Sequence, residues 1–264
     1  MKNVIHLFTI TLLFNVSLNA QVIKGVSYYT SIIKNEMKLD SSKMKDPQYV
    51  QMNEMLSKPF YDEFELKFTT NESTFNVVPK LEKPHPAKAK GMSISITLMP
   101  EGEVLYKNLL KGIFVNDKEI YGKQFLIEDS LKNNQWTLEK ESKMIGEYSC
   151  FKATYKKEVE LYIDAEDMEK TEIEENIVSA WYTPQIPVKN GPGDYAGLPG
   201  LILEVQDGTV RFLCTKIILN PTEPIEINQP TKGKKVSSDE FQVIMKKKMK
   251  EVMESFKNKK ETRN

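Results

Sequence analysis

The stretch that does most to decide the fold covers residues 181–205, WYTPQIPVKNGPGDYAGLPGLILEV. It holds four of the chain's 13 prolines and four of its 12 glycines, between two apolar runs typical of strands. Proline fixes φ, and glycine permits positive φ or the close approach of another backbone. The composition therefore predicts a rigid corner with one backbone path. Neither residue type supplies an acid, a base or a nucleophile, so the stretch predicts a shape and no reaction.

Two interpretations of this corner stay open. It serves the fold by turning the chain before a strand that begins at Leu201, or it also builds a recognition surface. In the second case the aromatic residues of the stretch are exposed anchors for a partner. The full set of candidate binding residues is Trp181, Tyr182, Pro184, Pro187, Gly191, Pro192, Tyr195, Gly197, Leu198, Pro199 and Gly200.

The rest of the chain alternates between apolar and polar residues, which is typical of strands with one buried face. Phe64, Leu66 and Phe68 alternate with polar neighbours, and the pattern resumes after a turn at residues 70–72. Similar runs fill residues 104–154, and residues 206–208, Gln-Asp-Gly, predict another hairpin before residues 209–218. We expect a mainly β (α+β) fold, a curved antiparallel sheet or half-open barrel, in a single domain over residues 21–264.

Two helices are expected beside the sheet. Asp46 followed by Pro47 predicts a short helix over residues 46–56. Ser237 and Glu240 can form a capping box, and apolar residues then recur every three or four positions, which predicts a longer helix over about 237–258. Lysines occupy its other face. The helix lies on or beside the sheet, or it docks as a basic amphipathic helix on a membrane surface.

The N-terminus has the order of a secretory signal: Lys2, an apolar run over residues 4–18, and small residues before the cut. We expect a signal peptide over residues 1–20, cleaved between Ala20 and Gln21. An N-terminal membrane anchor is the alternative, but the run is short against the roughly 20 residues needed to cross a bilayer. The processed chain is expected to be exported, to the periplasm or beyond, without spanning a membrane.

Charge and composition exclude several classes of protein. The 37 basic and 37 acidic residues become 36 and 37 once residues 1–20 are removed, a net charge of −1. This argues against a nucleic-acid partner, which usually needs a basic face. One histidine, His85, remains in the processed chain, and no GxSxG, GxxxxGK[ST] or GxGxxG motif occurs. We therefore nominate no catalytic residue, metal ligand or cofactor.

Cys150 and Cys214 are the two cysteines, each within a predicted strand. In an oxidising compartment they can form a disulfide; otherwise they are buried apolar thiols.

Residues 197–202, GLPGLI, are identical to the hexapeptide after which the bacterial GLPGLI family is named. The resemblance extends to residues 136–154, WTLEKESKMIGEYSCFKAT, and to the whole of residues 181–202. It implies an exported protein of undefined biochemical role. Relatives tend to be encoded in bacteria rich in outer-membrane TonB-dependent transporters, which implies an envelope role. The resemblance supplies no catalytic residues, and residues 193–196 correspond to a variable spacer.

Together these features predict a non-enzymatic envelope protein that binds a partner protein or an apolar ligand. One version resembles periplasmic lipoprotein carriers and predicts a lined cavity of roughly several hundred Å³ for a lipid. Another is an accessory protein to an outer-membrane TonB-dependent transporter, which predicts an exposed aromatic patch at Trp181 and Tyr182. A hydrolase is the remaining alternative. It requires a cleft that gathers a nucleophile with a carboxylate or lysine of shifted pKa.

Overall fold

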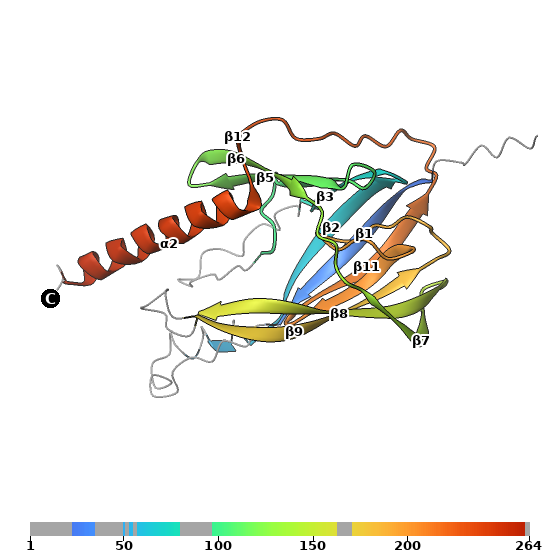
Figure 1. The fold of residues 1–264 in the computed structure, drawn as a ribbon, viewed down its shortest axis with the longest axis horizontal. Helices are drawn as coiled ribbons and strands as arrows, with labels where there is room; N and C mark the ends of the chain where they lie inside the picture. The colour runs from blue at the N-terminus through green and yellow to red at the C-terminus, as the bar shows by residue number, and fades with distance from the viewer. Residues whose placement is uncertain are drawn as a thin grey trace, which may run out of the picture.

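The computed structural model describes residues 23–34, 50, 53–54, 57–79, 97–162 and 171–261. Within these residues the chain forms one open, twelve-stranded sheet and one long α-helix (Figure 1). The strand order is β12-β6-β5-β4-β3-β2-β1-β11-β10-β9-β8-β7, and the two end strands do not pair with each other. A mainly β fold with an open sheet is thus confirmed. The strands are β1 (Lys24–Ile33), β2 (Phe60–Thr69), β3 (Glu72–Val77), β4 (Val104–Asn108), β5 (Ile113–Ile120), β6 (Lys123–Ser130), β7 (Thr137–Ile145), β8 (Tyr148–Tyr162), β9 (Thr171–Thr183), β10 (Leu201–Asp207), β11 (Val210–Leu219) and β12 (Lys234–Val236).

The alternating pattern gives the sheet one buried face. Phe64, Leu66 and Phe68 are fully buried on β2, and the predicted turn joins β2 to β3 as an antiparallel hairpin. The predicted hairpin at residues 206–208 likewise joins β10 to β11. All neighbouring pairs are antiparallel except β12, which runs parallel to β6. Because side chains alternate between the faces of a strand, each hairpin adds its apolar residues to the same side of the sheet.

The sheet bends through its middle, so its two halves face each other across the core. In Figure 1 the β5–β6 part and the β8–β9 part lie on opposite sides of β1, β2 and β11. The rings of Phe64 and Phe75 stack with centroids 4.9 Å apart, and Phe212 of β11 packs edge-on against Phe64. The same apolar cluster includes residues from β8, β9 and β10. Burial of this shared cluster, worth about 25 cal/mol per Å² of apolar area, joins the two halves.

The helix α2 (Ser238–Glu261) begins at the predicted capping box. The backbone N–H of Glu240 donates to Ser237 Oγ at 3.2 Å, and the N–H of Ser237 donates to Glu240 Oε2 at 2.9 Å. Phe241 packs edge-on against Phe125 of β6. Beyond this first part, α2 leaves β6 (Figure 1), and Lys246 Nζ on α2 lies 3.2 Å from Glu160 Oε2 of β8. No helix within the described residues is both long and apolar enough to cross a membrane.

One prediction about the strands is wrong, and several fall outside the described residues. The acidic composition of residues 164–175 predicts a solvated connection, but the residues from Thr171 onward belong to β9, where pairing with β8 satisfies their backbone groups. The predicted signal peptide with its Ala20–Gln21 cleavage site lies outside the described residues, as do His85 and most of the helix predicted over 46–56.

Candidate functional site

The proline- and glycine-rich corner is a folded loop over residues 184–200, between β9 and β10, here called the corner loop. Its side chains alternate: Ile186, Val188 and Asn190 are buried, and the residues between them are exposed. The backbone N–H of Leu201 donates to Ile186 O at 2.9 Å, and that of Ile202 donates to Asn190 O at 2.9 Å. The loop therefore packs along the start of β10 as part of the core.

At two positions the backbone of the corner loop can be formed only by glycine or strongly favours it. A Cβ on Gly200 would stand 2.1 Å from Thr183 O and 2.5 Å from its carbonyl carbon, so only hydrogen fits there. Gly197 has a φ of 97°, a conformation that L side chains rarely adopt. The prediction of a rigid corner is confirmed at these positions, one through close approach and the other through positive φ.

A buried lysine from β4 fixes the loop from the opposite half of the sheet. Lys107 is fully buried, and its Nζ donates to Gly191 O at 2.9 Å and to Gly193 O at 2.8 Å. Tyr195 O lies 3.5 Å from the same Nζ. An ammonium group has three N–H donors, so three converging carbonyls satisfy it completely. We call this arrangement the lysine clamp.

Burial lowers the pKa of Lys107 to about 7, and the negative charge of Asp194 partly opposes this shift. The desolvation of the ammonium is the larger effect because the residue is wholly removed from solvent. The lysine clamp therefore combines a saturated set of hydrogen bonds with an amine that titrates near neutral pH.

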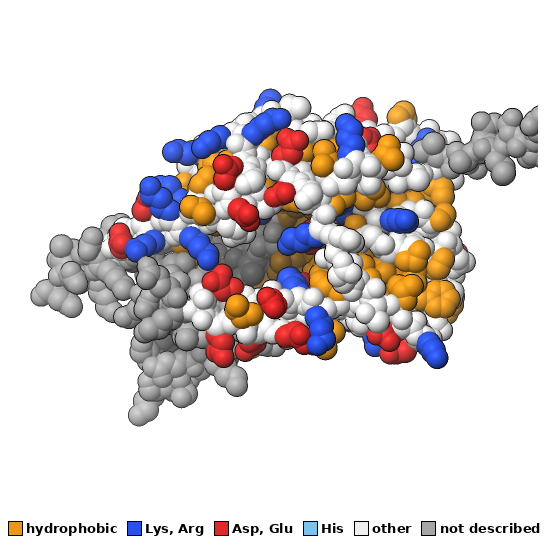
Figure 2. Space-filling model, viewed as in Figure 1, with side chains coloured by type: hydrophobic (Ala, Val, Ile, Leu, Met, Phe, Trp, Pro, Cys, Tyr) orange, Lys and Arg blue, Asp and Glu red, His pale blue; other side chains and the backbone are white. Residues whose placement is uncertain are grey.

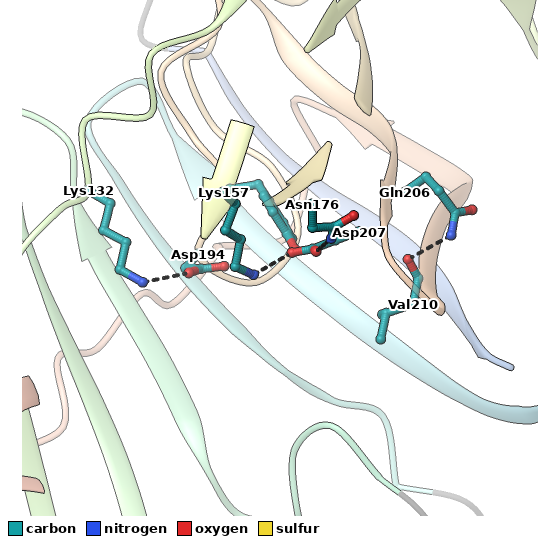
Figure 3. A network of polar contacts seen from close by, with 8 residues as sticks. Lys132, Lys157, Asn176, Asp194, Gln206, Asp207 and Val210 are labelled. Atoms are coloured by element: carbon teal, nitrogen blue, oxygen red, sulfur yellow. Dashed lines mark hydrogen bonds and ion pairs between the residues drawn. The ribbon is translucent and has the colours of Figure 1, made fainter. Parts of the chain in front are cut away.

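A second polar network fixes the middle of the corner loop (Figure 3). Asp207 of β10 accepts hydrogen bonds from Lys157 Nζ at 2.6 Å and Asn176 Nδ2 at 2.7 Å. The Tyr195 hydroxyl donates to the same carboxylate at 2.6 Å. Burial, followed by this hydrogen bond, raises the pKa of Tyr195. Since Tyr195 belongs to the loop and Asp207 to the strand after it, the network joins the loop to the sheet.

Trp136 completes the cover over the loop. Its Nε1 donates to Ala196 O at 3.0 Å, and its ring packs edge-on against Tyr155 with centroids 4.6 Å apart. The first residue of the tract that resembles the GLPGLI family thus contacts the corner loop directly.

The structure corrects the expected recognition surface. Tyr182 and Tyr195 are buried, with 6% and 8% of their surfaces exposed, so they are not exposed anchors. Tyr182 points inward because it follows the buried positions Val178 and Ala180 on β9. Trp181 is half-buried, with Lys143 Nζ 4.2 Å from the ring centroid. Of the other candidates, Pro184, Pro187, Gly197 and Pro199 are exposed, whereas Gly191, Pro192, Leu198 and Gly200 are buried.

Next to the lysine clamp lies a cavity of about 330 Å³ that the candidate residues did not include, here called the lysine-lined cavity. It opens between β4–β6 and the first turn of α2, and the face shown in Figure 2 is hollowed near that turn. Its polar lining includes Lys107, Lys118, Lys132, Asn116 and Asp194. Its apolar lining includes Met99, Leu105, Phe114, Ile127, Leu131 and Phe241.

Two observations concern groups that a metal site or a nucleophile would need. Within the described ranges, no group of three or more His, Cys, Asp or Glu side chains is placed to hold a metal ion. Burial raises the pKa of Cys150 to about 11 and that of Cys214 to about 12, so neither thiol is an activated nucleophile. Both thiols are free in the structure. They lie on β8 and β11, with two strands between them in the sheet order.

A family model matches a limited stretch of the chain. Residues 136–204 match the model of a family described as "Protein of unknown function (Porph_ging)". This stretch spans β7 to β10 and contains the whole corner loop. No curated protein matches the chain.

Two similar solved structures are titled "Structure of PNGF-II in C2 space group" and "Structure of PNGF-II in P21 space group". The first is 13% identical, with a TM-score of 0.48, over 84% of this chain and 32% of that one. The second is 11% identical, with a TM-score of 0.47, over 84% of this chain and 33% of that one. This chain therefore spans about a third of the length of these structures.

Proposed function

We propose that the chain is an exported, non-enzymatic binding protein of the cell envelope that holds an apolar ligand in the lysine-lined cavity. The observation that carries the proposal is the cavity itself, with a volume of about 330 Å³ and apolar side chains from three strands and α2. Ligand pockets typically measure about 300–1,000 Å³ and combine apolar walls with a few polar groups. The cavity matches that description at its lower limit.

Rigid walls support this role. Leu105 and Ile127 are buried core residues of β4 and β6, and Phe241 is anchored against Phe125 at the start of α2. The lysine clamp fixes the adjacent part of the corner loop. A preformed cavity avoids the entropic cost of ordering side chains when a ligand binds.

Family membership and export form part of the proposal. The stretch matched by the family of unknown function includes residues 197–202, on which the resemblance to the GLPGLI family rests. Export is proposed from the secretory-signal pattern of residues 1–20, and it predicts a processed protein that begins at Gln21. N-terminal sequencing of the protein from its native host tests this. An unprocessed N-terminus in the cytosol would contradict export.

The two alternatives have weaker support. The role of accessory protein to a TonB-dependent transporter is supported by the family resemblance alone. The exposed aromatic patch that this role predicts has less support, because two of its three aromatic residues, Tyr182 and Tyr195, are buried. A hydrolase needs an activated nucleophile. The two thiols have raised pKa values, and the Lys107 amine is held by backbone carbonyls.

Calorimetry with a neutral apolar probe, decan-1-ol, tests the proposed site. The wild-type protein is expected to bind it, and Phe114→Trp is expected to weaken binding because the larger ring narrows the cavity. Ile127→Arg should do the same by placing a charge among apolar walls. The control is Ile177→Arg, at an exposed isoleucine of β9 outside the cavity. Failure of the wild type to bind, or unchanged binding by both cavity variants, would overturn the proposal. Extraction of the natively purified protein, followed by mass spectrometry, identifies the natural ligand.

A further inference from the structure

We infer that the ligand of the lysine-lined cavity is a single-chain amphiphile with an anionic headgroup, such as a fatty-acid carboxylate, held by Lys118 and Lys132. This inference rests on the proposed function and specifies its ligand. It concerns the polar side of the cavity, whereas the proposed function concerns the apolar side.

The charges that line the cavity favour an anion. Among the described residues that line the cavity, three are lysines and one, Asp194, is a carboxylate. Glu103 lies near Lys118, and Asp129 accepts a hydrogen bond from the backbone N–H of the lining residue Ser238, but neither carboxylate lines the cavity. A site that is positively charged next to apolar walls is complementary to a ligand with a negative group on an apolar chain.

The two cavity lysines are only loosely paired with these carboxylates. Lys118 Nζ lies 3.8 Å from Glu103 Oε2, and Lys132 Nζ lies 4.0 Å from Asp194 Oδ2 (Figure 3). Both distances exceed the usual 2.7–3.2 Å of a hydrogen bond. Elsewhere on the sheet, by contrast, Lys143 lies 2.6 Å from Glu204. The ammonium groups of Lys118 and Lys132 therefore keep donors that a carboxylate headgroup can use.

Lys107 has a different role. Its three donors are directed at the carbonyls of the corner loop, so it adds positive charge to the cavity wall without offering a hydrogen bond. Asn116 also lines the cavity, and its Oδ1 is buried without a hydrogen-bond partner among the described residues. An amide can turn either its oxygen or its nitrogen toward the cavity, so it can complete the polar end of the site.

The size of the cavity restricts the apolar part of the ligand. A volume of about 330 Å³ lies near the lower limit of ligand pockets, which fits one chain better than the paired chains of a phospholipid. A single acyl chain with one carboxylate satisfies the volume, the apolar walls and the charge together.

Calorimetry with three probes of one chain length tests the inference: decanoate, decan-1-ol and decyltrimethylammonium. Decanoate is expected to bind about tenfold more tightly than decan-1-ol, the size of one charge-assisted hydrogen bond. The cationic probe is expected to bind more weakly than either. The double variant Lys118→Met/Lys132→Met should reduce decanoate binding to the level of decan-1-ol and leave decan-1-ol binding unchanged. The control is Lys156→Met on β8, whose lysine is 71% exposed and also ion-paired.

The outcomes separate this inference from the proposed function. Equal binding of decanoate and decan-1-ol, unaffected by the lysine double variant, would overturn the anionic headgroup and leave the apolar site standing. Absence of binding by all three probes would overturn both. An affinity for decanoate that is unchanged by Phe114→Trp would place the anion site outside the cavity and overturn the inference.

Discussion

Two lysines that contact the corner loop differ in the strength of their interactions with it. Lys107 is fully buried and lies within 2.9 Å of two loop carbonyls, whereas Lys132 is 73% exposed and lies 4.0 Å from the Asp194 carboxylate. Both line the same cavity. The loop is thus held through its backbone by a buried cation, and its one exposed carboxylate contributes little to its position. The donors of Lys107 are saturated by loop carbonyls, whereas Lys132 keeps donors that a ligand can use.

The largest effect is expected where the corner loop meets β9. Gly200→Ala places a methyl group 2.1 Å from Thr183 O, and the three nearest atoms all belong to the backbone of Thr183 and Pro184, which cannot move aside as a side chain can. We expect the free energy of unfolding to fall by about 4 kcal/mol or more, or the protein not to fold. Urea denaturation followed by circular dichroism measures this. Gly146→Ala, at a φ of 59° with open space around it, should cost only about 1–2 kcal/mol. Equal losses would show that the close approach is unimportant.

The second-largest loss of stability is expected when the lysine clamp is removed. Lys107→Met keeps the length and apolar stem of the side chain but leaves loop carbonyls without a donor. An unsatisfied buried acceptor costs about 1–3 kcal/mol, so we expect the free energy of unfolding at pH 7 to fall by about 2–3 kcal/mol. The same denaturation experiment applies. A variant as stable as the wild type would mean that the clamp does not hold the loop.

The clamp also predicts a pH dependence with a definite sign. The pKa of Lys107 is about 7 in the folded protein and 10.5 as the ordinary value, so the unfolded chain binds more protons between these pH values. Stability contributed by this group therefore rises with pH across that window. From pH 7 to pH 9, the wild type should gain roughly 2 kcal/mol relative to Lys107→Met. A constant difference between the two proteins over this range would contradict the shifted pKa.

A smaller loss is expected at the second network. Tyr195→Phe removes the hydroxyl that donates to Asp207 at 2.6 Å but leaves Lys157 and Asn176 bound to the carboxylate. A hydrogen bond to a charged group is worth about 1.5 kcal/mol, which is the expected loss in thermal or urea denaturation. Tyr121→Phe, at an exposed tyrosine, serves as the control and should change stability by less than about 0.5 kcal/mol.

The smallest effect is expected at the cavity rim. Lys132→Met breaks a long, exposed ion pair, and such pairs contribute about 0–1 kcal/mol. We expect the free energy of unfolding to change by less than about 0.5 kcal/mol. A loss as large as that of Lys107→Met would remove the contrast between the two lysines.

Local patterns in the sequence predicted most of the architecture. Alternation identified β2, β3 and the β10–β11 hairpin, and Ser237 with Glu240 identified the start of α2, because each signal lies within a few residues of its effect. The rigidity of the corner loop was also predictable, since glycine and proline restrict their own backbone. The expected exposure of Tyr182 and Tyr195 was wrong, because burial depends on which half of the sheet lies opposite.

The lysine clamp and the lysine-lined cavity depend on contacts between residues far apart in the sequence, which local patterns do not predict. Lys107 lies 84 residues before Gly191, so no local pattern joins them. One signal was present: Lys107 stands two residues after Leu105, on the inward side of β4, opposite Phe114 of β5. A lysine at an inward position of a strand implies a buried partner. Naming that partner requires the bend of the sheet, which brings β4 to the corner loop.

The lysine clamp bears on how the chain can be divided. The stretch that carries the family likeness, residues 136–204, begins after Lys107. Excised as a fragment, it would lack the lysine that binds the carbonyls of its corner loop, and the carbonyls of Gly191 and Gly193 would lose that donor. The corner loop within residues 136–204 therefore depends on β4 for its conformation. Grafting these residues into another protein would require β4 as well.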